Sequence, residues 1–276
     1  MPFVRFVLTN FHHLAWQFWW STKDHFKYHR ANECPEYGMI DCYCGLFGQG
    51  KTKQAVKRVT EIYKHYNGLE IWDAERQEWI TQEIKVFSNV KLSAIPYVEF
   101  TSMQQMVDCM GTNYGVINLF LIDEASVVFN SREYKENFNT LALNTILTSR
   151  HHKIGIILTS QRFNHLDALL RQVTSTVIQC RYFPFLHIQR MIYYNAWDLE
   201  CSKNPELCQK LKTEYQYTSG LIYSYYDTFA MVGKVQKECL EKEYVTDAET
   251  IENIGDNVYD KSATNSKIIL KRFGKK

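Results

Sequence analysis

Short runs of apolar residues, separated by segments with helical periodicity, fill the middle of the chain. A run that is apolar almost throughout is typical of a strand buried on both faces of a parallel sheet. Four runs have this character: Met39 to Cys44, Val116 to Ile122, Ile154 to Gln161 and Ser175 to Phe183. Segments that predict helices lie between them: Lys51 to Tyr66, Leu141 to Ser149 and Leu166 to Val173. This alternation predicts an α/β fold whose mostly parallel sheet is flanked by helices.

The pattern is weaker in the rest of the chain. Its signals favour a hairpin or insertion at 71–90, a strand at 85–92, a short helix at 102–110 and a late strand region at 222–232. From Pro184 onward the periodicity fades, and the sequence ends in a basic tail at 266–276. These parts are therefore expected to lie around the α/β core or to follow it.

The first 28 residues are rich in aromatic side chains and have helical spacing. Their apolar positions form one face, which Trp16, Trp19 and Trp20 widen. One interpretation is a helix that packs on the core or on a neighbouring subunit. The other is an amphipathic helix that contacts a membrane interface through residues 1–21, because Trp side chains prefer to lie there.

Composition narrows the class of protein. The chain has 276 residues, of which 45% are hydrophobic and 22% charged, a normal globular balance. The net charge of +2 means that any nucleic-acid site must be a local basic patch. Eight cysteines form no C-x-x-C pair, which predicts reduced thiols in a cytosolic protein. The sequence shows no cleavable signal peptide and no run of the roughly 20 apolar residues that span a bilayer.

A phosphate-binding pattern lies between the first expected strand and the helix that follows it. The pattern G-x-x-x-x-G-K-T is formed by Gly45, Leu46, Phe47, Gly48, Gln49, Gly50, Lys51 and Thr52. Glycines let backbone N–H groups turn toward phosphate oxygens, and the helix start adds a positive dipole. Lys51 would reach the β and γ oxygens of ATP, and the Thr52 hydroxyl would ligate Mg²⁺. The alternative is a glycine-rich turn with an exposed lysine.

A second motif follows the strand at Val116 to Ile122, which ends in Asp123 and Glu124. Adjacent carboxylates at the end of an apolar strand are costly unless a cation meets them, and Mg²⁺ is such a cation. Asp123 would hold Mg²⁺ through a water, and Glu124 would polarise the water that attacks the γ-phosphate. The alternative is an acidic helix cap. The Asp-Glu pair favours a hydrolase over a small-molecule kinase.

Three further residues are candidates for the same chemistry. Gln161 ends a strand expected to neighbour both motifs, so its amide could contact the γ-phosphate or the attacking water. Its alternative is a polar strand end that faces solvent. Arg150 and Arg171 flank that strand, and either could be an arginine finger that reaches the site of an adjacent subunit. For each arginine the alternative is a surface salt bridge.

These motifs, in this order, resemble the zonular occludens toxin-like family of filamentous-phage morphogenesis ATPases, within the HerA/FtsK group of DNA-pumping P-loop ATPases. The nucleotide loop, "LIDEA", "SRHH" and "IILTSQ" carry the resemblance, which also covers Arg150 and His151. It implies ATP and Mg²⁺ as cofactors, and a role in assembling or extruding a virion or in packaging viral DNA. Phage members usually carry a transmembrane helix after the ATPase domain, and this sequence shows no such segment.

The resemblance also sets expectations for assembly and organisation. It implies a ring of identical subunits, expected to be a hexamer, with viral DNA or virion assembly proteins as partners. The expected location is the host cytoplasm, with possible peripheral contact at the inner face of the membrane. The expected parts are an aromatic segment (1–37), a P-loop ATPase core (38–183) and a C-terminal extension with a basic tail (184–276).

Two other classes of function compete with a DNA-moving ATPase. One is a different P-loop NTPase, such as a nucleotide kinase or a signalling NTPase. A kinase would need an arginine-rich lid and an acceptor pocket, and a GTPase would need an N-K-x-D sequence, which the chain lacks. The other is a structural protein with a decayed nucleotide site, against which the intact Lys51, Thr52, Asp123 and Glu124 argue.

Overall fold

A computed structural model describes residues 2–73, 76–111, 115–128, 146, 148–202, 207–218 and 220–227. The helix expected at 141–149 falls almost wholly outside the described residues, and the basic tail at 266–276 falls wholly outside them. Seven of the eight cysteines are in the described part; all seven are free thiols, and five are buried.

The fold is built on an eight-stranded sheet with the order β11-β10-β9-β1-β8-β7-β4-β6. Its strands are β1 (Ile40–Cys44), β4 (Glu83–Ser88), β6 (Val98–Glu99), β7 (Val116–Ile122), β8 (Ile154–Ser160), β9 (Thr176–Phe183), β10 (Ile188–Asn195) and β11 (Lys210–Tyr217). The six strands from β9 to β6 run parallel, whereas β10 and β11 are antiparallel. The predicted α/β fold with a mostly parallel sheet is confirmed.

Helices cover both faces of this sheet because its central strands are apolar on both sides. On one face α2 (Lys51–Tyr66) buries Ala55, Val56, Val59 and Ile62 against the sheet. On the other, α7 (Ala168–Val173) and α8 (Ala196–Ser202) contribute Leu170, Ala196 and Leu199 to a second cluster, which also contains Met106 of α3 (Gln104–Asp108). In β1 the side chains alternate between these two clusters, as strand geometry requires.

The remaining elements lie at the periphery of the sheet. Hairpin strands β2 (Glu70–Asp73) and β3 (Glu78–Thr81) occur where a hairpin or insertion was predicted. Strand β5 (Lys91–Leu92) pairs with β12 (Tyr226–Asp227), and α4 (Ala125–Val128) follows β7. The described residues also form the short 3-10 helices η1 (Arg30–Asn32), η2 (Phe163–His165), η3 (Pro184–Leu186) and η4 (Gly220–Tyr225).

The aromatic N-terminal stretch forms the predicted helix, α1 (Pro2–Lys27), with a kink at Asn10. Many of its large apolar side chains are exposed, including Phe18 at 76%. Within the part of the chain that the structure describes, no helix has both the length and the apolar character needed to cross a membrane.

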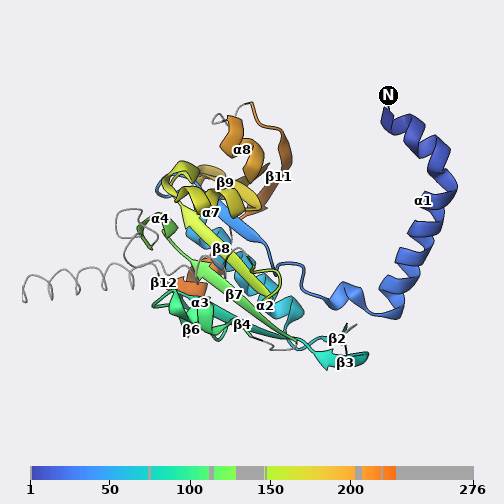
Figure 1. The fold of residues 1–276 in the computed structure, drawn as a ribbon. Coiled ribbons are helices and arrows are strands. Elements are labelled where there is room, and N and C mark those ends of the chain that lie inside the picture. The colour runs from blue at the N-terminus through green and yellow to red at the C-terminus, as the bar shows by residue number, and fades with distance from the viewer. Residues whose placement is uncertain are drawn as a thin grey trace, which may run out of the picture. The chain divides into compact units, whose positions relative to one another are not determined.

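The parallel strands bring three separate segments to one edge of the sheet (Figure 1). Strands β1, β8 and β7 lie next to one another and point the same way, so Gly45, Gln161 and Asp123 follow their carboxyl ends. In open α/β sheets this edge is where ligands bind. Strand β8 separates β1 from β7, so the two predicted motifs meet across an intervening strand.

Candidate nucleotide site

The loop between β1 and α2 has the shape that the glycine pattern predicts. Gly50 has φ of 75°, in the left-handed region, and a Cβ there would lie 2.4 Å from the Gln189 side-chain oxygen. A Cβ on Gly45 would lie 2.8 Å from the Cys180 carbonyl oxygen. Gln189 donates to the Gln49 carbonyl at 2.8 Å, which ties the loop to β10. The loop backbone is therefore held in place by β9 and β10, and larger residues would displace it.

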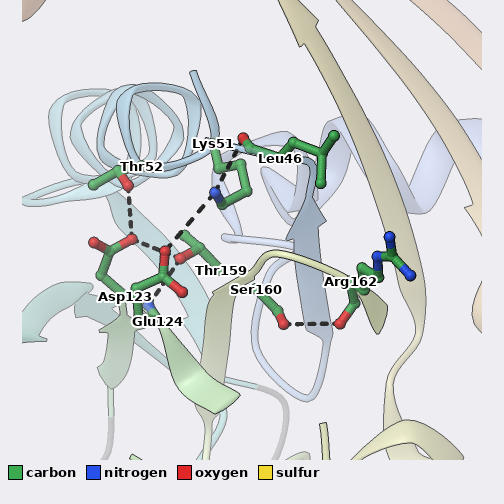
Figure 2. Close-up of polar contacts among 8 residues, drawn as sticks. All are labelled: Leu46, Lys51, Thr52, Asp123, Glu124, Thr159, Ser160 and Arg162. Carbon is green, nitrogen blue, oxygen red and sulfur yellow. Dashed lines mark hydrogen bonds and ion pairs between the residues drawn. The ribbon is translucent and has the colours of Figure 1, made fainter. Parts of the chain in front are cut away.

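Lys51, the first residue of α2, turns its side chain back across this loop. Lys51 is only 6% exposed, and its Nζ donates to the Leu46 carbonyl at 3.4 Å. The same Nζ lies 3.8 Å from Glu124 Oε1 (Figure 2). The ammonium group is thus placed between the glycine loop and a carboxylate, where it can bind the terminal phosphates of a nucleotide.

Thr52 and Asp123 meet although 71 residues separate them in sequence. The Thr52 hydroxyl donates to Asp123 Oδ1 at 2.8 Å (Figure 2). Two ligands on one octahedral Mg²⁺ ion, each about 2.1 Å from it, lie roughly 3 Å apart. The hard oxygen atoms and their spacing fit Mg²⁺, so these two residues would hold the ion, directly or through a water.

Two residues that the sequence patterns did not single out hold the Asp123-Glu124 segment. The Thr159 hydroxyl donates to Asp123 Oδ1 at 2.6 Å and accepts from the Glu124 backbone N–H at 2.9 Å. On the opposite side, the Asn89 amide accepts from the Asp123 N–H at 2.8 Å and donates to the Asp123 carbonyl at 2.9 Å. The only signal in the sequence was a polar residue near the end of an apolar strand, as in "IILTSQ" and "VFSN".

The hydrogen bonds from Thr159 and Asn89 matter because Glu124 has a strained backbone. Its φ is 47°, in the left-handed region that residues with side chains rarely adopt. Such a conformation persists only when the surrounding structure imposes it, and the bonds from Thr159 and Asn89 do so. The strain turns the Glu124 carboxylate toward Lys51.

Burial raises the pKa of Glu124 above its ordinary value of 4.5, and the neighbouring Asp123 charge adds to the rise. Lys51 and a hydrogen bond from the Gln161 side chain counteract it. One carboxylate oxygen, Oε2, is buried without a hydrogen-bond partner among the described residues. A carboxylate with a raised pKa and an unused acceptor oxygen can take a proton from water.

Gln161 and the two arginines have different placements. Gln161 directly follows β8, and its side chain interacts with Glu124. Arg150 packs against Gly38, before β1, so it lies at the opposite edge of the sheet. The seven residues of β8 separate it from Gln161 by about 20 Å.

Arg171 is engaged within its own chain. Its Nε donates to Glu200 Oε2 at 2.7 Å, and its Nη1 donates to the carbonyls of Leu166 and Asn164. These contacts hold the guanidinium between α7 and α8. To reach a neighbouring subunit the side chain would have to leave all three acceptors, so the geometry favours the salt-bridge interpretation for Arg171.

These features together define a P-loop NTPase fold with a nucleotide site. They are the glycine loop, its lysine, and the Thr–Asp and Lys–Glu pairs at the carboxyl edge of a parallel sheet. The sequence model of the zonular occludens toxin (Zot) family matches residues 39–232, and the chain belongs to that family. The predicted resemblance is therefore confirmed.

Solved structures of low sequence identity are also similar. The N-terminal domain of zonular occludens toxin from Neisseria meningitidis is 18% identical, with 69% of this chain and 100% of that chain covered and a TM-score of 0.47. The genome packaging NTPase B204 from Sulfolobus turreted icosahedral virus 2, in complex with ATP-gammaS, is 13% identical, with coverage of 66% and 98% and a TM-score of 0.37. B204, the DNA-packaging ATPase from Sulfolobus turreted icosahedral virus, is 12% identical, with coverage of 67% and 100% and a TM-score of 0.36. No curated protein matches the chain.

Proposed function

We propose that the protein hydrolyses ATP with Mg²⁺ and uses the energy in virus assembly, to package viral DNA or extrude the virion. The observation that carries the proposal is that two side-chain contacts lie together at one edge of the sheet. These are the hydrogen bond from Thr52 to Asp123 and the ion pair between Lys51 and Glu124. These two contacts support a phosphate-binding lysine, a metal position and a base that lie side by side, which is what phosphoryl transfer to water needs.

Binding comes from the loop and the start of α2. Backbone N–H groups of the loop and the positive end of the helix dipole attract the triphosphate, and Lys51 neutralises its terminal oxygens. Mg²⁺, held by Thr52 and Asp123, would neutralise charge that develops on the β and γ oxygens. In the structure Lys51 pairs with Glu124, so an arriving γ-phosphate competes for the ammonium and releases that carboxylate.

Hydrolysis then depends on Glu124 and Gln161. Glu124 accepts a proton from the water that attacks the γ-phosphate, and its unused Oε2 supplies the acceptor. The Gln161 side chain interacts with Glu124 and lowers its pKa, so the amide can respond when a phosphate occupies the site. Both side chains follow strands of one rigid sheet, which fixes their spacing.

The work done with this energy is proposed from family membership. The resemblance to phage morphogenesis ATPases supports a ring of identical subunits, expected to be a hexamer, that acts on viral DNA or virion assembly proteins in the host cytoplasm. In such a ring, Arg150 of one subunit could complete the site of the next, because it is exposed and lies away from its own loop.

Turnover measurements on two variants test the catalytic proposal. Lys51→Ala should abolish ATP binding and hydrolysis, because the γ-phosphate loses its cation. Glu124→Gln should bind ATP but lose hydrolysis by about 10²-fold or more, because an amide cannot act as a base. Glu61→Gln, at an exposed carboxylate on α2, is the matched control and should turn over normally. Wild-type turnover in Glu124→Gln would remove Glu124 from this role.

A second set of measurements separates the proposal from other P-loop enzymes. Turnover that releases inorganic phosphate and changes when DNA is added supports a DNA-moving ATPase. Transfer of the phosphate to a small acceptor instead of water would show a kinase, and hydrolysis that ignores DNA would favour a signalling NTPase.

Helix α1 supports a proposed membrane contact through residues 1–21. Trp16, Trp19 and Trp20 form one ring cluster, and the Lys23 ammonium lies over Trp19 and Trp20 at 5.2 and 4.9 Å. Aromatic rings beside a cation suit the inner face of a membrane with anionic lipids. The full chain should float with anionic vesicles, and deletion of residues 1–21 should stop flotation. Aggregation of the shortened chain would instead indicate that the helix packs against protein.

A further inference from the structure

A cavity of about 610 Å³ lies beside the phosphate loop, on the side away from Asp123 and Glu124. Gly45, Leu46 and Gln49 of the loop form one wall. Strands β9 and β10 form the floor, and the segment after Gln161 closes another side. None of the described lining residues is an aspartate or a glutamate. The cavity therefore shares a wall with the nucleotide site but has a different electrostatic character.

Three arginines line this cavity: Arg162, Arg181 and Arg190. Within the described part of the chain none of them forms a salt bridge, and Arg190 Nε is buried without an acceptor. Figure 2 shows the Arg162 guanidinium directed away from Asp123 and Glu124. All three charges are thus available to a ligand in the cavity.

Two of these arginines are forced close together by the sheet. Arg181 and Arg190 are direct partners in the antiparallel register of β9 and β10. Both guanidinium groups lie over the ring of Phe183, at 5.2 and 5.8 Å. Like charges directly opposite each other destabilise a strand pair, and a buried charged donor without an acceptor adds a further cost. An anion between these groups would remove both penalties.

We infer that this arginine cavity binds the phosphodiester groups of a nucleic-acid strand. The guanidinium fork matches phosphate oxygens in pairs, and the cavity volume is in the range that holds a nucleotide-sized group. The aromatic rings of Phe183 and Tyr194 accompany the arginines, as at sites that bind single strands. Arg162 and Arg181 are exposed, so a polymer can reach them.

The inference rests on the proposed function and adds a place where strand and nucleotide meet. Arg162 directly follows Gln161, and the Gln161 side chain interacts with Glu124 and lowers its pKa. A nucleic-acid strand held by Arg162 is therefore one residue away from a side chain that interacts with the proposed base. Movement of the nucleic-acid strand and the state of the γ-phosphate would therefore influence each other through the end of β8.

Binding of a fluorescent 20-nucleotide single strand to the full chain, measured by anisotropy at several salt concentrations, tests the inference. Arg181→Gln should weaken binding about tenfold and reduce the slope of log affinity against log salt by about 0.7, the value for one phosphate contact. Arg190→Gln should do the same. Arg76→Gln, which removes an equal charge from an exposed hairpin position, should leave affinity and slope unchanged.

Binding of a fluorescent ATP analogue to the same variants distinguishes the strand from ATP itself. ATP affinity that is retained in Arg181→Gln while strand affinity falls supports the inference. Loss of ATP affinity with unchanged affinity for the nucleic-acid strand would show that the cavity binds ATP, and would overturn the inference. Unchanged strand binding in both arginine variants would also overturn it, even if wild-type protein turns over ATP. Arginine-dependent strand binding by a protein without turnover would support the inference and refute the proposed ATPase.

Discussion

Thr159→Val is the most informative single change at the nucleotide site, because the Thr159 hydroxyl contacts both Asp123 and Glu124, the two carboxylates that we propose for metal binding and catalysis. In the structure it donates to the Asp123 carboxylate at 2.6 Å and accepts from the Glu124 N–H at 2.9 Å. Valine keeps the shape of threonine and its preference for strands but removes both bonds. Thr159 is fully buried, so water cannot replace the lost hydroxyl without displacing other groups.

The structure sets the size of the effect on stability. A hydrogen bond to a charged group contributes about 1.5–3 kcal/mol, and a buried N–H left without an acceptor costs about 1–3 kcal/mol. Taken near the lower ends, the unfolding free energy should fall by about 3 kcal/mol. For a chain of this size that corresponds to a drop in Tm of roughly 6–12 °C.

The effect on catalysis should exceed the effect on ATP binding. Without the hydroxyl, the strained backbone at Glu124 can relax and move the base away from the γ-phosphate. The rate constant kcat should fall by about 10²-fold, within the range that general bases contribute. The KM for ATP should change little, because the Thr159 hydroxyl bonds that the valine removes go to Asp123 and Glu124 and not to the phosphate loop. Half-saturation by Mg²⁺ should need more ion, since Asp123 loses one of the bonds that orient it.

Thermal unfolding and phosphate release, measured on the same samples well below the Tm, check these values. Thr159→Ser retains the hydroxyl and is the matched control, so its kcat should stay within a few-fold of wild type. A Thr159→Val protein that is folded and hydrolyses ATP at the wild-type rate would refute the argument that this hydroxyl positions the carboxylates. Equal loss of activity in the serine and valine variants would show that packing, and not the hydroxyl, is what matters.

Three other outcomes follow from the same geometry. Burial raises the pKa of Asp41 from 3.8 to about 6, so the charged carboxylate destabilises the fold above pH 6. Asp41→Asn should therefore raise the unfolding free energy at pH 7.5 by up to about 3 kcal/mol. This gain in stability should shrink between pH 6 and pH 4, where the wild-type carboxylate becomes protonated. Because burial raises the pKa of Glu124, the acidic limb of kcat should have its midpoint above pH 4.5, and a midpoint at or below this value would contradict its role as base. Turnover per subunit should rise with protein concentration, and concentration-independent turnover would refute a site shared between subunits. A mixture of inactive Lys51→Ala and Arg150→Ala subunits should regain activity, because each supplies what the other lacks. If only the mixture of Lys51→Ala with Arg171→Ala subunits regains activity, the arginine finger is Arg171.

Much of the nucleotide site could be predicted because its first half is local. Strand β1, the glycine loop and helix α2 are consecutive, so a short stretch of sequence specifies the phosphate cradle and its lysine. The bounds of α2, Lys51–Tyr66, agree with the helical spacing of its apolar residues. The apolar run of β7 likewise placed Asp123 and Glu124 at a strand end, since a strand buried on both faces leaves little freedom in its pattern.

Strands β10 and β11 could not be predicted in the same way. Their polar residues contact α2 and one another, as when Tyr193 donates to Glu214 at 2.7 Å and Lys57 donates to Gln216 at 2.6 Å. A strand at the edge of a sheet, with exposed positions on both faces, has no continuous apolar run. The opposed pair Arg181 and Arg190 depends on the register of β9 with β10, which no local pattern reveals.

The sequence by itself therefore determined the α/β class, the phosphate loop and the position of Asp123 and Glu124 at a strand end, because each depends on residues close together in the chain. Only the tertiary structure decided that β8 lies between β1 and β7, and that order has the largest consequences for the site. It places Thr159 level with Asp123, brings Gln161 to Glu124 and puts Arg150 at the far edge of the sheet. These relations arise from strand order and register, which depend on burying apolar surface across the whole sheet and not on the neighbours of any one residue.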